Sequence, residues 1–161
     1  MTNFTITTDN ENKIQILYHR ILKYWNERDA TRMGKLFSDN GDLIGFDGSH
    51  FNSKEKIEKH LSYIFTNYPT PKYVGKIRNI KFLNSESGIL IAVGGLVTED
   101  EKDIHQELNA IQTLVAVKND KEEWKITLYQ NTPATYHNRP ELCEQLTEEM
   151  RLVLHQHGPA S

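Results

Sequence analysis

The sequence predicts an α+β fold, because helical and strand-like patterns occupy separate parts of the chain. Up to about residue 68, apolar side chains recur at helical spacing, interrupted by one short strand-like run. Between about residues 74 and 132 the pattern changes to strand-like stretches separated by turns. Helical spacing returns after Pro140. Helices segregated from antiparallel strands in this way are typical of α+β proteins.

The first helix is predicted from about Asn10 to Asn26, with Asp9 or Asn10 as its N-terminal cap. Its apolar positions are Ile14, Leu17, Ile21, Tyr24 and Trp25. Asp29 is then placed to accept hydrogen bonds from the free amides of a second, short helix. That helix is predicted to carry Met33, Leu36 and Phe37.

A turn at Asn40-Gly41-Asp42 is predicted to precede a short apolar strand over Leu43–Phe46. Ser53 is predicted to cap a third helix, which ends at the Pro69 region because proline cannot continue the hydrogen-bond ladder. The apolar side of this helix carries Ile57, Leu61, Ile64 and Phe65.

The second half of the chain predicts a meander of strands over about 74–82, 87–97, 109–118 and 124–132. Asn119-Asp120 is the predicted turn of the last hairpin, and Pro133 closes the sheet. A terminal helix is predicted over 139–157, where apolar residues return to helical spacing.

The stretch from Ser87 to Val97 also predicts how the sheet is covered. Both of its alternating sets of side chains are apolar or glycine, whereas a strand with one solvated face would alternate with polar residues. We therefore expect cover on both faces of the sheet. Because the helices suffice for only one face, we expect a second subunit on the outer face, and hence a homodimer.

Composition narrows the class of protein. The chain has 161 residues, a length that predicts a single domain over 1–161, and its net charge is −3. The acidic excess argues against a nucleic-acid partner. No apolar run reaches the roughly 18–20 residues that cross a bilayer, and the N-terminal residues lack the pattern of a signal peptide. We therefore expect a cytoplasmic protein with no membrane association.

Motifs for metals and cofactors are missing from the sequence. Cys143 is the single cysteine, and the histidines do not follow a ligand spacing, so we expect no metal site. His60, beside the apolar stripe of the third helix, is predicted to be a packing residue. The chain has no glycine-rich dinucleotide motif, Walker-type loop or Gly-x-Ser-x-Gly elbow, and we expect no cofactor.

A series of short motifs resembles one known family in order and spacing. They are Trp25-Asn26, Asp29-Ala30, Leu36-Phe37-Ser38-Asp39-Asn40-Gly41, Phe46-Asp47-Gly48-Ser49, Trp124-Lys125-Ile126 and Gln130-Asn131-Thr132. Over about residues 10–135 the chain resembles the SnoaL-like branch of the nuclear transport factor 2-like superfamily. More narrowly, it resembles the SgcJ/EcaC group of small bacterial proteins.

The resemblance implies a cone-shaped fold, with three helices packed on a strongly curved mixed sheet, a pocket inside the cone, and dimerisation through the outer sheet face. The superfamily includes ketosteroid isomerase-like, dehydratase and polyketide cyclase enzymes, as well as members without catalysis, so its fold does not decide function. The resemblance also implies that the pocket holds a small, mostly apolar ligand. The protein is then either a cofactor-free isomerase or cyclase that transfers a proton, or a non-catalytic ligand-binding or dimerisation module.

Asp47 is the candidate catalytic residue. It follows Phe46 at the end of a predicted strand, where nearby aromatic rings would disfavour the charged carboxylate, raise its pKa and let it act as an acid or base. The alternative is that Asp47-Gly48-Ser49 is a local turn, in which Asp47 accepts backbone amides.

Seven further residues are candidates for ligand binding. Trp25, Phe37, Phe46 and Tyr63 would supply an apolar lining with one hydroxyl, although large aromatic residues also serve simply as core. Gln112, Tyr129 and Asn131 are polar groups in apolar strands, and a buried amide that faces a cavity can bind a ligand. Strand alternation turns either Tyr129 and Asn131 or Gln130 inward, and Asn131 is the favoured candidate.

Overall fold

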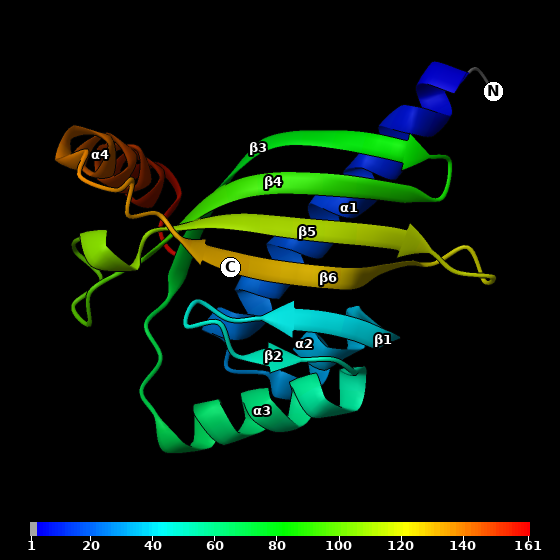
Figure 1. Ribbon diagram of the computed structural model, residues 1–161, viewed down its shortest axis with the longest axis horizontal. Helices are drawn as coiled ribbons and strands as arrows, with labels where there is room; N and C mark the ends of the chain where they lie inside the picture. Colours follow the sequence, from blue (N-terminus) through cyan, green and yellow to red (C-terminus); the bar gives the residue numbers. More distant parts are fainter. Residues whose placement is uncertain (1–2) are drawn as a thin grey trace.

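The computed structural model describes residues 3–161, with their side chains from Thr8 onward (Figure 1). The predicted α+β class is confirmed. In chain order, the elements are α1 (Asn3–Asn26), α2 (Ala30–Lys35), β1 (Phe37–Ile44), β2 (His50–Phe51), α3 (Lys54–Asn67), β3 (Tyr73–Asn84), β4 (Ser87–Leu96), a short 3₁₀ turn η1 (Gln106–Leu108), β5 (Ala110–Lys118), β6 (Trp124–Pro133) and α4 (Pro140–His157).

The strands form one mixed sheet in the order β2-β1-β6-β5-β4-β3. β1 runs parallel to β6, and the other neighbouring pairs are antiparallel. Figure 1 shows α1 crossing behind the curved sheet, α3 beyond the β1–β2 edge, and α4 at one end of β3 and β4. None of the helices in the described part of the chain combines the length and apolar character that a membrane span requires.

Two of the predicted helix caps are confirmed. Asp29 Oδ1 accepts from the Arg32 amide at 3.0 Å, and Ser53 Oγ accepts from the Lys56 amide at 3.2 Å. The predicted start of the first helix is wrong, since α1 begins at Asn3 and Asn10 lies inside it with 7% exposure. Asn10, the polar residue before the apolar stripe, is therefore a buried residue within the helix and not its cap.

β1 differs most from the prediction. Phe37 does not belong to a helix but is the first residue of β1, and the predicted turn at Asn40-Gly41-Asp42 lies within that strand. The parallel pairing with β6 accommodates this segment through a register shift between Phe37 and Asp42. Because the parallel partner of β1, β6, lies more than 80 residues later, nothing in the local sequence could reveal this pairing.

The main core lies between α1 and the inner face of the sheet. Ile14, Tyr18 and Ile21 of α1 have no exposed surface, and neither do Leu90 of β4 and Leu114 of β5. Burying large aliphatic side chains contributes roughly 1.5–3 kcal/mol each, so this layer holds the helix on the sheet.

The outer face of the sheet is covered at one end by α4. Met150 and Leu154 of α4 form a second buried cluster with Val74 and Val93. Glu149 anchors the helix to β3, since it pairs with Lys76 at 3.1 Å and also with Arg78. These partners hold the pKa of Glu149 below its usual value. The expectation that the helices could cover only one face is therefore wrong for this end of the sheet.

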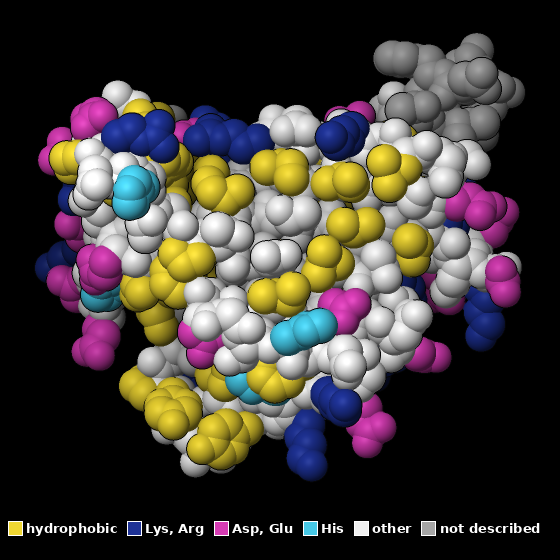
Figure 2. Space-filling model, in the orientation of Figure 1, with side chains coloured by type: hydrophobic (Ala, Val, Ile, Leu, Met, Phe, Trp, Pro, Cys, Tyr) yellow, Lys and Arg dark blue, Asp and Glu magenta, His cyan; other side chains and the backbone are white. Residues whose placement is uncertain are grey.

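The rest of the outer face is apolar and partly accessible. Ile89 and Ile91 of β4, Val115 of β5 and Leu128 of β6 are half-buried there. Figure 2 shows hydrophobic side chains spread over the central strands, with Lys and Arg along the β3 edge. The two apolar sets predicted for the 87–97 strand thus serve two purposes, one inside the core and one on this outer surface.

Candidate functional site

A cavity of about 320 Å³ lies between α1, α2, α3 and the inner face of the sheet. Most of its lining is apolar, including Leu22, Met33, Leu43, Leu61, Ile64 and Leu96. A concave, mostly apolar space with a few polar groups is the usual form of a small-molecule site. The predicted residues Trp25, Phe46, Asp47, Tyr129 and Asn131 all line it.

Trp25 contributes an apolar ring to the cavity wall. Its indole packs edge-on against Phe65 and Tyr73, with ring centroids 5.3 and 5.4 Å apart. The indole N–H donates to the carbonyl of Pro71 at 2.9 Å. Because that donor already has a partner, Trp25 offers shape and apolar surface rather than a hydrogen bond.

Tyr129 and Asn131 share the inner face of β6, and Gln130 lies on the opposite face, so the register left open by the sequence is now decided. The Tyr129 hydroxyl is buried and has no hydrogen-bond partner among the described residues. Burial raises the pKa of Tyr129 well above its usual value, and the neighbouring Tyr18 and Tyr73 raise it further. Tyr129 therefore stays protonated and able to donate.

Asn131 is connected to the core by two hydrogen bonds in series. Its Oδ1 accepts from Gln112 Nε2 at 3.1 Å, and Gln112 Oε1 accepts from the Tyr18 hydroxyl at 2.6 Å. Gln112 has no exposed surface and is not part of the cavity lining, so it does not reach the cavity itself. Its amide instead forms hydrogen bonds with Tyr18 in the core and with Asn131, which lines the cavity.

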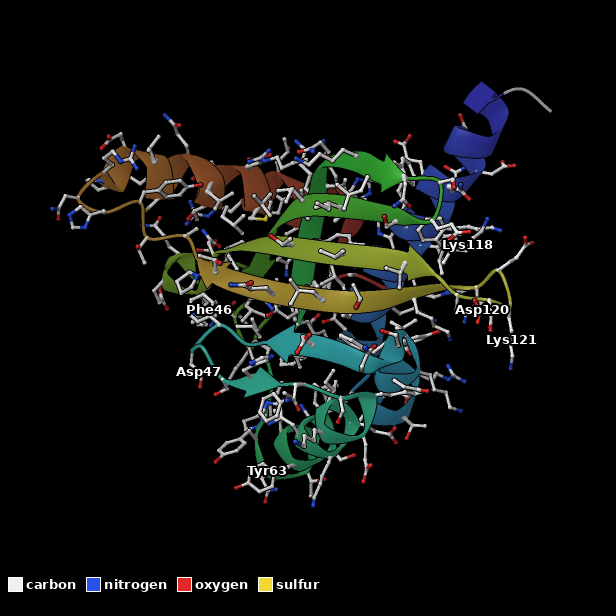
Figure 3. All side chains as sticks on the ribbon, turned by 45° about the vertical axis from the view of Figure 1, so that its right-hand side comes forward. Phe46, Asp47, Tyr63, Lys118, Asp120 and Lys121 are labelled. Atoms are coloured by element: carbon white, nitrogen blue, oxygen red, sulfur yellow. The ribbon has the colours of Figure 1, made fainter. Side chains whose placement is uncertain are left out.

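Asp47 lies at the mouth of the cavity, in the turn that follows β1 (Figure 3). Its Oδ1 accepts from the Ser49 amide at 2.9 Å, and Gly48 between them has a φ of 91°. That hydrogen bond favours the carboxylate and lowers the pKa of Asp47. The predicted rise in its pKa is therefore wrong, because the side chain is exposed in a turn and not enclosed by aromatic rings.

His60 of α3 also lines the cavity and was expected only to pack. Its ring stacks on Phe51, with centroids 3.8 Å apart. Burial lowers the pKa of His60, and the nearby Asp47 carboxylate offsets part of that effect. The imidazole is thus neutral at pH 7 and able to accept a proton. Sequence spacing could not bring His60 and Asp47 together, because they lie on separate elements.

Two predicted ligand residues lie away from the cavity. Tyr63 is 58% exposed and packs against Tyr68 on the outer side of α3, as its place in Figure 3 shows. Phe37 is 1% exposed and belongs to the core rather than to the cavity lining. Neither residue is part of the cavity lining, because aromatic identity does not reveal the direction in which a side chain points.

Comparisons with known proteins agree on the fold. No protein-family model and no curated protein matches the sequence. A domain of unknown function with a cystatin-like fold from Nostoc punctiforme has a TM-score of 0.76 at 20% identity, over 92% of this chain and 94% of that one. An NTF-2-like protein of unknown function from Shewanella oneidensis has a TM-score of 0.60 at 21% identity, over 76% and 98%. A putative scytalone dehydratase from Novosphingobium aromaticivorans has a TM-score of 0.65 at 13% identity, over 82% and 89%.

Helices packed on a curved mixed sheet that encloses an apolar cavity define a class of α+β pocket folds. Within that class, the chain shares the fold of these cystatin-like and NTF-2-like structures, which agrees with the fold that the sequence resemblance implied. Because proteins with this fold include a putative dehydratase and proteins of unknown function, the fold leaves the activity to be argued from the cavity.

Proposed function

We propose that the chain binds a small, mostly apolar molecule with one polar group, which meets Tyr129 and Asn131 inside the cavity. The observation that carries this proposal is the buried Tyr129 hydroxyl without a partner in a largely apolar space. A buried hydroxyl left unpaired costs about 1–3 kcal/mol, which a bound polar atom would recover. The size of the cavity, about 320 Å³, fits a bicyclic aromatic compound better than a larger ligand.

Calorimetric titration with acetylnaphthalene, an aromatic ketone, tests this proposal. We expect binding to the intact chain, and we expect Tyr129→Phe to weaken it about tenfold, the equivalent of about 1.4 kcal/mol. The same substitution should leave the unliganded fold as stable or slightly more stable, because it removes an unpaired polar atom. Tyr63→Phe, which alters an exposed hydroxyl, is the matched control. Equal affinity of both variants would contradict the role of Tyr129.

A second candidate function is proton transfer at the cavity mouth, favoured by the position of His60 beside Asp47. His60 would remove a proton next to the ligand's polar group, and the Asp47 carboxylate would stabilise the imidazolium that forms. Asp47 itself is the weaker base because its lowered pKa favours the carboxylate. The fold shared with a putative scytalone dehydratase is compatible with this chemistry by analogy.

Hydrogen exchange of acetylnaphthalene in heavy water measures this activity. We expect His60→Gln to slow exchange of the methyl protons by about 100-fold or more, as the loss of a general base does, while ketone affinity is kept. Asp47→Asn should have a smaller effect, about tenfold, because it removes only the neighbouring charge. His155→Gln, on the exposed side of α4, is the control. Unchanged exchange in His60→Gln would remove His60 from the mechanism.

The outer face of the sheet supports a homodimer, in which a second copy covers Ile89, Ile91, Val115 and Leu128. These residues form an apolar surface that α4 leaves partly accessible. Light scattering at micromolar concentration should give twice the mass of one chain, and Ile91→Glu should give monomers. Leu152→Glu, at a position that is 55% exposed on α4, should keep the dimer. A wild-type monomer would overturn the proposal, with ligand binding as the function that remains.

A further inference from the structure

We infer that Tyr18 and Gln112 are positioning residues that fix the Asn131 amide with its N–H donors toward the cavity, so that the cavity selects ligands carrying a hydrogen-bond acceptor such as a carbonyl. This inference rests on the proposed function, because it specifies the ligand of the same cavity. Neither Tyr18 nor Gln112 lines that cavity. Both have no exposed surface, and they act only through Asn131.

The direction of the two hydrogen bonds determines which end of the Asn131 amide is free. The distance from Tyr18 Oη to the Gln112 amide is 2.6 Å, which fits an O–H···O bond better than an N–H···O bond. The tyrosine therefore donates, and it occupies the Gln112 oxygen. Gln112 then has only its N–H donors left, and one of them meets Asn131 Oδ1 at 3.1 Å. Asn131 Nδ2 remains as the donor for the cavity.

Two glycines make room for this arrangement. Gly75 of β3 and Gly94 of β4 lie opposite each other in the sheet. A Cβ atom on Gly75 would lie 2.2 Å from the Tyr18 hydroxyl oxygen, and one on Gly94 would lie 2.7 Å from Gln112 Nε2. The close approach of the Tyr18 and Gln112 side chains to the strands therefore requires glycine at both positions.

The consequence is that the inner face of β6, which lines the cavity through Tyr129 and Asn131, carries two side chains with a free donor, the Tyr129 hydroxyl being the more deeply buried. Asn131 Nδ2 can only donate, and the neutral Tyr129 hydroxyl has a proton without an acceptor among the described residues. A carbonyl oxygen can accept from both. A hydrocarbon of the same shape leaves both donors unpaired, and an ammonium group places donor against donor, so each should bind more weakly.

Three probes of matched shape test the selectivity: acetylnaphthalene, isopropenylnaphthalene, in which a CH₂ group replaces the ketone oxygen, and naphthylethylamine. For the wild-type chain we expect the ketone to bind at least tenfold more tightly than either of the others. Tyr18→Phe should reduce this preference severalfold, because the Gln112 amide and then the Asn131 amide become free to turn. Tyr63→Phe should leave the preference unchanged. A merely structural role for Tyr18 would alter stability without changing the ratio of affinities.

Further variants keep the inference falsifiable if Tyr18→Phe does not fold. Gln112→Met removes the amide that links Tyr18 to Asn131, at a similar side-chain volume. It should therefore reduce the ketone preference in the same way. Asn131→Asp replaces the donors with acceptors and should favour the amine over the ketone. Equal binding of the three probes to the wild-type chain, or an unchanged preference in Tyr18→Phe and Gln112→Met, would overturn the inference while ligand binding stands. No binding of any probe would overturn ligand binding itself, and the inference with it.

Discussion

Gly75→Ala is expected to lower the free energy of unfolding by about 3 kcal/mol, near the upper end of the cost of overpacking a core. The new Cβ atom would lie 2.2 Å from Tyr18 Oη and 2.6 Å from Leu22 Cδ1. Tyr18 cannot move aside easily, because it is fully buried and hydrogen-bonded to Gln112. The gain from replacing a strand glycine, roughly 0.5–1 kcal/mol, is too small to compensate. Chemical denaturation of the purified variant measures the change.

A second substitution checks that the clash with Tyr18 causes the loss. In the double variant Gly75→Ala with Tyr18→Phe, the nearest clashing atom is gone, so part of the stability should return relative to the sum of the two single effects. Gly45→Ala is the control, since its nearest neighbour, Asp47 Oδ1, lies at 3.4 Å, an ordinary contact. That variant should stay within about 0.5 kcal/mol of the wild type. Strictly additive losses in the double variant would contradict the proposed clash.

Phe37→Ala is expected to cost about 4 kcal/mol of stability, as is usual for removing a fully buried phenylalanine. The ring is 1% exposed and belongs to the core cluster that joins α1, α2 and the sheet. Because Phe37 is not part of the cavity lining, the folded variant should bind acetylnaphthalene as the wild type does.

Denaturation and calorimetric titration of the same Phe37→Ala sample separate these two effects. Tyr63→Ala, which removes a ring that is 58% exposed, should change stability by no more than about 0.5 kcal/mol. A selective loss of ligand affinity in folded Phe37→Ala would restore the contact role that the sequence suggested for this residue.

The parts of the fold that could be predicted are those whose signals are local. Helical spacing, the caps at Asp29 and Ser53, and the hairpin turn at Asn119-Asp120 each involve residues a few positions apart, and the structure agrees with them. The doubly apolar strand over 87–97 correctly indicated that both faces of the sheet carry apolar side chains. It could not indicate that α4 covers one end of the second face, since that depends on where the chain returns after β6.

The candidate site was predictable only where strand alternation, or a position at the end of a strand or helix, limited the directions in which a side chain could point. Trp25, Phe46, Asp47, Tyr129 and Asn131 line the cavity, and their contact with a ligand stays a prediction. Tyr63 and Phe37 lie away from it, because an aromatic residue fits a core, a surface or a pocket wall equally well. His60 was missed as a site residue, since its neighbour Asp47 lies 13 positions away on another element.

By itself, the sequence determined the α+β class, most of the elements and the apolar character of both sheet faces, because periodicity and capping act between near neighbours in the chain. Only the tertiary structure decided the length of β1, the ionisation of Asp47 and the direction of the Asn131 amide. Each of these depends on partners set by long-range packing, such as the Tyr18 hydroxyl, which lies 94 residues before the Gln112 amide that it orients.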